Sequence, residues 1–322
     1  MPAPLPNIVL VLSMSHEPQL SSLGRPGYSG RACLTSESWA TNLVSLLSSS
    51  VPSHHQVWTG SGKVGIHVDP LPLVLRKAGY RTSFIGPRDA ENLVTQCGFN
   101  DLIILQSNDA DENAVSLIEH PAHTPSFITC VIPEFSTRWQ AIASQLASRK
   151  EPRGLVLETS ITPLETQGEA GTLDPEAISA PFMVSLPGAG RKIDGSTQLW
   201  SILDIAPSLL CSLGIKVPYT MVGKDLHQYW LGKARKAIRF PRDRCLFEHT
   251  DGSKTMWNGR YLLAVQPGRE AGAIFDLELR DGAARNLWDD PSSTVVKSQL
   301  LLELLWAQLD KECMPMPRIA GA

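Results

Sequence analysis

Three side chains that lie close together in the chain have the types needed for nucleophilic catalysis. Ser50 is followed by Val51 and Pro52 and then by His54 and His55. A serine hydroxyl becomes a nucleophile when an adjacent imidazole accepts its proton. The alternative interpretation, which we favour, is that Ser50 caps a helix with proline in its first turn. Ser50, His54 and His55 are therefore candidate catalytic residues only.

A third histidine, His16, follows the first apolar run of the sequence. Neutral imidazoles are common zinc ligands. If the fold brings His16 to His54 and His55, these three side chains could form a metal site together with Glu17. The competing expectation is that loop histidines are exposed and bind nothing, and it leaves His16 as a weak metal candidate.

Short apolar runs alternate with helical patterns over the first two thirds of the chain. The β-branched, continuous runs are typical of strands that are covered on both faces in a parallel sheet. Strand and helix in alternation predict an α/β domain with a mainly parallel central sheet flanked by helices. The expected strands are 7–12, 81–85, 102–105, 126–132, 154–158 and 181–186, and the expected helices are 38–47, 71–77, 137–147 and 199–213.

The pattern changes after about residue 235 to shorter strands separated by turns. Asn258-Gly259 predicts a tight hairpin in which both residues take positive φ. We expect a small antiparallel subdomain with one closing helix, and the domains are predicted as 1–235 and 236–322. Its expected strands are 244–248, 254–257, 261–265 and 273–276, and its helix is 293–309.

Composition restricts the partners that we expect. The formal net charge is −3 and no block of lysine and arginine stands out, so nucleic acid is not an expected partner. The six cysteines are scattered without a C-x-x-C pair, which favours free, mostly buried thiols. No run approaches the roughly 20 apolar residues of a membrane span, and no signal peptide is recognised, so the expected location is cytoplasmic without a membrane partner.

Several ordered stretches together resemble the sulfatase branch of the alkaline-phosphatase superfamily over nearly the whole chain. Residues 50–60 have the spacing of the nucleophile signature, a Cys or Ser followed by x-P-S-R and ending in T-G, although His54 stands where the arginine is expected. The other matching stretches are 6–13, 73–82, 180–184, 203–210, 247–252 and 258–261. The resemblance implies an alkaline-phosphatase-like fold.

The resemblance also implies a divalent cation held by carboxylates and an amide, with calcium as the usual metal. The paired aspartates expected after the first strand fall on Met14 and Ser15, and the second acidic pair falls on Ile161 and Thr162. The expected lysine reads Pro87 and an expected histidine reads Glu134, so the site is shortened and degenerate.

Two functional hypotheses follow. The first is a sulfatase-like protein that has lost ester hydrolysis and acts as a binding or scaffolding protein for a small molecule or another protein, with no cofactor expected. The second is an active or altered hydrolase of sulfate or phosphate esters that uses Ser50 with a nearby histidine and a divalent ion, either calcium or zinc. No pattern in the chain indicates an oligomeric state.

Overall fold

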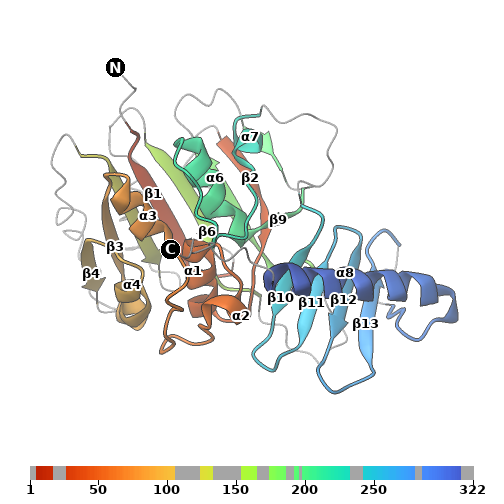
Figure 1. Ribbon diagram of the computed structural model, residues 1–322. Coiled ribbons are helices and arrows are strands. Elements are labelled where there is room, and N and C mark those ends of the chain that lie inside the picture. The colour runs from red at the N-terminus through yellow and green to blue at the C-terminus, as the bar shows by residue number, and fades with distance from the viewer. Residues whose placement is uncertain are drawn as a thin grey trace, which may run out of the picture.

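Two sheets and their helices form the part of the chain that the computed structural model describes (Figure 1). The described residues are 5–16, 27–105, 124–132, 154–164, 174–185, 192–195, 198–232, 242–279 and 285–312. The larger sheet belongs to the first 201 residues, and the smaller sheet lies beside its far edge. The α/β class with a small antiparallel subdomain and one helix is therefore confirmed.

The larger sheet has nine strands in the order β4-β3-β5-β1-β6-β7-β2-β8, with β9 also paired to β2. Five neighbouring strands, from β4 to β6, run parallel. β7 pairs antiparallel with β6, and β2 pairs antiparallel with β7. The strands are β1 (Ile8–Ser13), β2 (Gly27–Cys33), β3 (Arg81–Pro87), β4 (Asp101–Leu105), β5 (Ser126–Ile132), β6 (Leu155–Ser160), β7 (Ser179–Ser185), β8 (Ile193–Asp194) and β9 (Trp200–Ser201).

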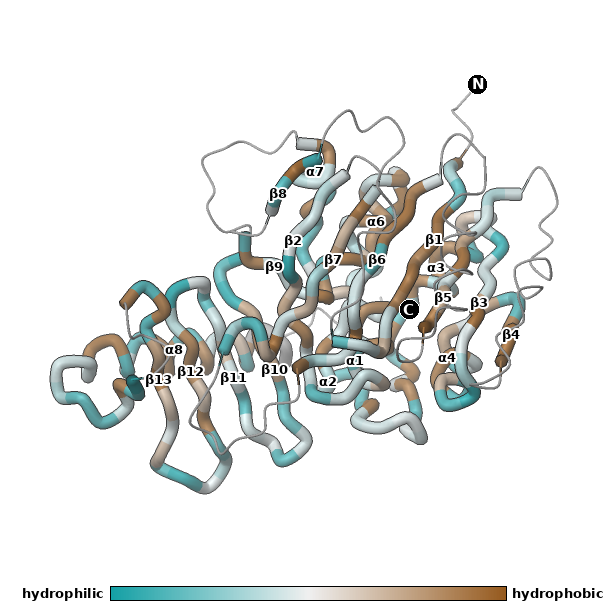
Figure 2. The backbone as a smooth tube through the Cα atoms, turned by 180° about the vertical axis from the view of Figure 1, so that it is seen from behind, coloured by the Kyte–Doolittle hydropathy of each residue, from teal (hydrophilic) through white to brown (hydrophobic). Residues whose placement is uncertain are grey.

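One face of this sheet is covered by helices whose apolar side chains meet the sheet in the main core (Figure 1). β1 contributes Ile8, Leu10 and Leu12 to that core, and all three are almost fully buried. The brown central strands in Figure 2 show the same concentration of apolar residues. The helices of this part are α1 (Trp39–Ser48), α2 (Pro52–His55), α3 (Leu71–Lys77), η2 (Arg88–Ala90), α4 (Glu91–Gln96), η4 (Ile202–Asp204), α6 (Ile205–Ser212) and α7 (His227–Trp230).

The second sheet is a four-stranded antiparallel meander covered by one long helix. Its strands are β10 (Cys245–Glu248), β11 (Lys254–Trp257), β12 (Tyr261–Val265) and β13 (Gly272–Asp276), in that spatial order. The turn η5 (Pro291–Ser293) precedes α8 (Thr294–Glu312), and Leu300 and Leu304 of α8 pack on Met256, Leu263 and Ile274 of the sheet. The small subdomain therefore has a hydrophobic core of its own, between its sheet and α8.

Several sequence predictions need correction. The Asn258-Gly259 hairpin is present, but only Gly259 has positive φ, because the Asn258 side chain instead accepts hydrogen bonds from the amides of Arg260 and Tyr261. The segment expected as helix 199–213 begins with β9 and a 3-10 turn, because Ser201 caps the turn. The strand β2 was not predicted. The helix 137–147 and the domain boundary at 235 lie outside the described residues.

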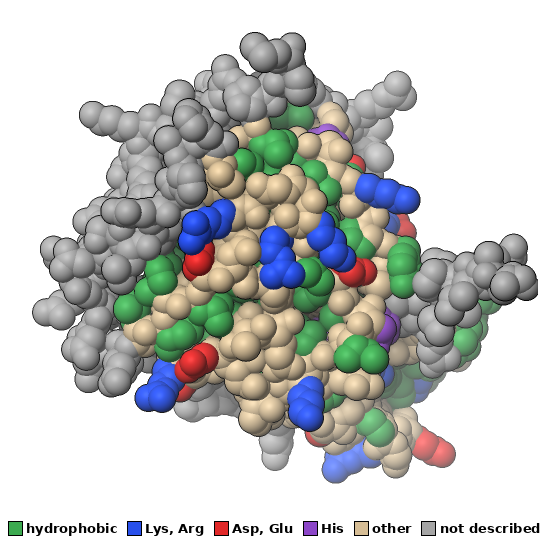
Figure 3. All heavy atoms as spheres, turned by 60° about the vertical axis from the view of Figure 1, so that its left-hand side comes forward, with side chains coloured by type: hydrophobic (Ala, Val, Ile, Leu, Met, Phe, Trp, Pro, Cys, Tyr) green, Lys and Arg blue, Asp and Glu red, His purple; other side chains and the backbone are tan. Residues whose placement is uncertain are grey.

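The cysteines agree with the expectation of free, mostly buried thiols where the structure describes them. Five cysteines are free, and four of these are buried. On the end of the molecule that carries β4, single basic and acidic side chains are interspersed, as Figure 3 shows. In the described part of the chain, no helix combines the length and the apolar character needed to cross a membrane.

A buried carboxylate, Asp204, connects the two parts of the molecule. Its side chain is fully buried and accepts hydrogen bonds from the backbone amides of Ser201 and Lys224, at 2.9 and 2.8 Å. Nη1 of Arg242 lies 2.8 Å from Oδ1 of Asp204. Because Arg242 lies three residues before the first residue of β10, this ion pair holds the start of the small subdomain against η4.

We expect Asp204→Asn to lower the free energy of unfolding by about 3 kcal/mol, because the variant leaves the Arg242 charge buried without its counterion. Urea denaturation measures this loss. The matched control is Asp243→Asn, which removes an exposed partner of Lys224. The control should change stability by less than about 1 kcal/mol, and equal effects of the two variants would contradict the role given to Asp204.

Candidate functional site

Of the two histidines considered as partners of Ser50, His54 is the one that contacts it. Oγ of Ser50 lies 2.7 Å from Nδ1 of His54. The ring of His67 packs edge-on against His54, with centroids 4.4 Å apart. Burial, and to a lesser extent His67, lower the pKa of His54, so its imidazole is neutral at pH 7 and able to accept a proton. Val51 and not Ser50 occupies the N-cap of α2, so the expectation that Ser50 caps this helix is wrong.

The accessibility of Ser50 limits what this pair can do. Ser50 has no solvent-exposed surface, so an ester in solution has no direct approach to its hydroxyl. Within the described chain, no hydrogen bond joins His54 to a carboxylate that would orient the imidazole as in a catalytic triad. The pair has the elements of a nucleophile and a base, but it is enclosed.

His55 points away from Ser50 and into the protein. Its Nδ1 accepts a hydrogen bond from the backbone amide of Val57, so Nε2 carries the proton and donates to Oγ of Ser45 at 2.8 Å. Oγ of Ser45 is in turn 2.7 Å from Oγ1 of Thr35. Burial lowers the pKa of His55 to about 3. His55 is therefore a neutral hydrogen-bonding residue between α1 and α2, and the structure does not place it beside Ser50.

His16 lies just beyond the end of β1, and its Nδ1 is buried without a hydrogen-bond partner. No group of three His, Cys, Asp or Glu side chains that could hold a metal occurs among the residues that the structure describes. Those residues include His54 and His55, but Glu17 lies outside them.

The positions where the resemblance expects metal ligands lie together at the carboxyl ends of β1 and β6. These two strands are parallel neighbours, with Ser13 opposite Ser160, so the residues that follow them share one edge of the sheet. Oγ of Ser160 lies 2.6 Å from the carbonyl oxygen of Ser15 and 3.1 Å from the amide of Thr162. The hydroxyl thus satisfies backbone groups of both segments.

The side chains at this edge are mostly apolar or hydroxylic. Ile161 is fully buried in the main core, and Met14 packs against the same core. Ser15 and Thr162 offer only hydroxyl groups. Glu158, the described carboxyl nearest this edge on β6, pairs with Val11 inside the ladder, and burial raises its pKa to about 8. A divalent cation needs several anionic or carbonyl oxygens, so the residues described here do not fit one.

One buried amide, Asn42, holds this edge to the first turn of α1. Oδ1 of Asn42 accepts hydrogen bonds from the amides of Thr35 and Ser36, at 3.0 and 3.1 Å. Nδ2 donates to the carbonyl oxygens of Ser36 and Ile161, at 2.7 and 3.0 Å. All the hydrogen-bonding capacity of the amide is used in joining three segments, so its role is structural.

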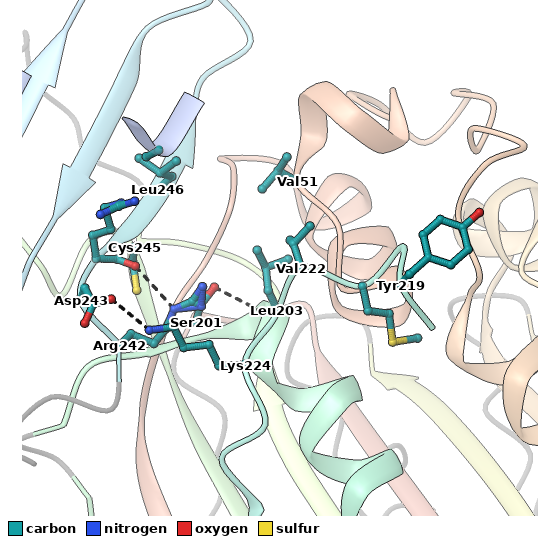
Figure 4. A pocket seen from close by; sticks show the side chains of 13 residues that line it. Val51, Ser201, Leu203, Tyr219, Val222, Lys224, Arg242, Asp243, Cys245 and Leu246 are labelled. Atoms are coloured by element: carbon teal, nitrogen blue, oxygen red, sulfur yellow. Dashed lines mark hydrogen bonds and ion pairs between the residues drawn. The ribbon is translucent and has the colours of Figure 1, made fainter. Parts of the chain in front are cut away.

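A cavity of about 400 Å³ lies between η4 and β10, where the two parts of the molecule meet (Figure 4). Lys224 and Arg242 lie on one side of it, whereas Val51, Leu203 and Val222 lie on the other. Nζ of Lys224 is 3.2 Å from Oδ2 of Asp243. The remaining lining residues are Ser201, Tyr219, Met221, Arg244, Cys245, Leu246 and Ala307.

No local pattern predicts this cavity, but the segment that leads into its lining is strongly basic. Six basic residues and only one acidic residue occur between Lys233 and Arg244. The expectation that no block of lysine and arginine stands out is therefore wrong for residues 233–244. Lys224 and Arg242 come together only in the fold, through their shared contact with Asp204.

The cluster at 248–251 looks catalytic in the sequence, and its contacts are those of a brace between the two parts. Glu248 is buried. It accepts a hydrogen bond from the amide of Ser53 in α2 and forms an ion pair with Lys254. Oε1 of Glu37 accepts hydrogen bonds from both the amide and the hydroxyl of Thr250. These contacts fasten β10 to α2 and to the residue before Ser38, the N-cap of α1.

Comparison with known proteins shows the fold. The structure matches BT1596, a 2-O GAG sulfatase, with a TM-score of 0.77 and 11% identity over 96% of this chain and 93% of that one. It matches a phosphonate monoester hydrolase from Silicibacter pomeroyi with a TM-score of 0.72 and 12% identity over 95% and 96% of the two chains. It matches the lipoteichoic acid synthase LtaP from Listeria monocytogenes with a TM-score of 0.60 and 14% identity, over 98% of this chain and 94% of that one.

Sequence comparison gives no match, either to a protein-family model or to a curated protein. The structural neighbours belong to the sulfatases and related alkaline-phosphatase-superfamily proteins, so the chain has a sulfatase-like fold, as the sequence predicted. Identities of 10 to 16% in these matches support the fold and carry no residue roles to this chain.

We expect the stability that His55 contributes to be lost in acid. The folded-state pKa of about 3 lies below the unfolded value near 6.5, so the unfolded chain takes up the proton first as the pH falls below 6.5. Wild type should exceed His55→Gln in unfolding free energy at pH 7.5, and this difference should shrink by about 2 to 3 kcal/mol at pH 4.5. Denaturation at both pH values measures it. The control is the exposed His67→Gln, whose difference from wild type should not depend on pH. If the difference between wild type and His55→Gln is also the same at both pH values, the role given to His55 is contradicted.

Proposed function

We propose that this chain is a binding or scaffolding protein on a sulfatase-like fold, and that metal-dependent ester hydrolysis has been lost. The observation that carries this proposal is the edge after β1 and β6. Ile161 is fully buried in the main core there, and Met14 packs against that core. Carboxylates at these positions would neutralise an ester's negative charge through a bound cation.

The loss is cumulative. A metal site that loses one ligand is weaker but can persist. Here all four expected ligand positions lack an anionic group, because they are occupied by Met14, Ser15, Ile161 and Thr162. The reaction also needs positive charge opposite the leaving group, and Pro87 stands where a lysine is expected. Residues that build the fold, such as Asn42 and Asp204, keep complete sets of partners.

A second candidate function is an altered ester hydrolase that uses Ser50. The 2.7 Å contact between Ser50 and a neutral His54 favours it. The complete burial of Ser50 opposes it, because the α2 segment would have to move before a substrate reached the hydroxyl.

Hydrolysis of 4-nitrophenyl sulfate and 4-nitrophenyl phosphate distinguishes these functions. We expect no turnover above the buffer rate, with calcium, with zinc or without metal, and the same result for Ser50→Ala. Metal analysis of the purified protein should find no stoichiometric divalent ion.

The outcome that would overturn the proposal is turnover that Ser50→Ala and His54→Ala abolish and His55→Gln retains. His55→Gln is the appropriate control because His55 belongs to the same short helix but contacts Ser45 instead of Ser50.

A further inference from the structure

The cavity between η4 and β10 has a polar and an apolar side, and the two differ in charge. Lys224, Arg242 and Arg244 bring three positive charges to its lining, against the negative charge of Asp243 in the lining and that of Asp204, which pairs with Arg242 behind it. Asp243 is largely exposed, with 81% of its side-chain surface accessible to solvent. Its interaction with Lys224 is therefore weakened by water and salt and competes poorly with a ligand.

Arg242 is positioned before any ligand arrives. Only 12% of its side-chain surface is exposed, and Asp204 holds its Nη1 at 2.8 Å. A guanidinium that is already ordered and largely removed from water loses little conformational freedom when it binds an anion. The ion pair with Asp204 thus sets the cation at the cavity wall as well as joining the two parts of the molecule.

The opposite wall is suited to an apolar group. Val51, Leu203 and Val222 lie there in Figure 4, and Met221 and Leu246 also line the cavity. Hydrogen bonds to the backbone hold this wall in place. The Ser49 hydroxyl donates to the carbonyl of Leu203 at 2.7 Å and accepts from the amide of Gly223 at 2.9 Å. A side chain at Gly223 would collide with the Leu203 carbonyl, since a Cβ atom there would lie 1.9 Å from its oxygen.

We propose that this cavity binds a small organic anion, with its charged group against Lys224 and Arg242 and its apolar body against Leu203 and Val222. A volume of about 400 Å³ lies within the range of small-molecule sites. Aryl phosphonates and aryl carboxylates share the required chemistry. This inference rests on the proposed function in one respect: the anion is taken to be a ligand that the protein binds without hydrolysing it.

Calorimetric titration with phenylphosphonate, which has no ester bond to hydrolyse, tests the site. We expect saturable binding at low salt, and about tenfold weaker binding by the uncharged analogue benzyl alcohol. Inorganic phosphate alone should also bind more weakly, because it leaves the apolar wall in water.

Variants identify the location. Lys224→Met should weaken phenylphosphonate binding about tenfold, and Asp243→Asn should strengthen it by removing the competing carboxylate. The matched control is Lys216→Met, an exposed lysine outside the cavity lining, which should bind like wild type. Both informative variants act at partly or largely exposed side chains, so folding is expected to be retained.

Absence of saturable binding, or binding that Lys224→Met and Asp243→Asn leave unchanged, would overturn the proposal. Phenyl phosphate in a parallel titration separates it from the proposed function. Release of phenol would contradict the loss of hydrolysis, whereas the anion site in this cavity is supported only by phenyl phosphate binding that Lys224→Met weakens.

Discussion

The arrangement of the sheet edge depends on the buried amide of Asn42. Its two polar atoms join the first half of α1, the loop that follows β2 and the residue that follows β6. Four of its five hydrogen bonds are made to backbone groups, and the fifth comes from the Thr35 hydroxyl, so none of them involves the side chains that follow β1 and β6. The fold therefore tolerates Met14 and Ile161 at positions where the related enzymes are expected to carry charged ligands. The chemistry of the site and the stability of the scaffold are separable in this molecule.

Asp204 has the corresponding role at the other end of the sheet. A fully buried carboxylate requires nearly complete compensation, and the amides of Ser201 and Lys224 and the guanidinium of Arg242 supply it. The same contacts order a cationic wall and leave a cavity where the small subdomain meets the main sheet. A requirement of folding thus also produces the feature that we interpret as a ligand site, away from the sheet edge where a metal would be expected.

Local patterns predicted most of the elements but not the contacts between distant segments. Helix 71–77 was predicted at its observed bounds, and continuous apolar runs marked the parallel strands. β2 escaped notice because Gly27-Tyr28-Ser29-Gly30-Arg31 contains no apolar run, and its pairing with β7 decides its conformation. The sequence offered both His54 and His55 as partners of Ser50, and the fold brings only His54 to it, because Ser50 lies just before the N-cap of α2. The opposite direction of His55 depends on Ser45 and Thr35, and the cavity depends on residues from five separate segments, which no local pattern reveals.

We propose that the protein's own hydrogen bonds and apolar side chains, without a metal ion, complete the edge after β1 and β6. The most direct measurement is the thermal unfolding midpoint of the purified protein in EDTA, in calcium and in zinc. A ligand that binds only the folded state raises this midpoint in proportion to its concentration relative to its dissociation constant. The account predicts the same midpoint in all three solutions, whereas a midpoint that rises with calcium or zinc and falls in EDTA would contradict it.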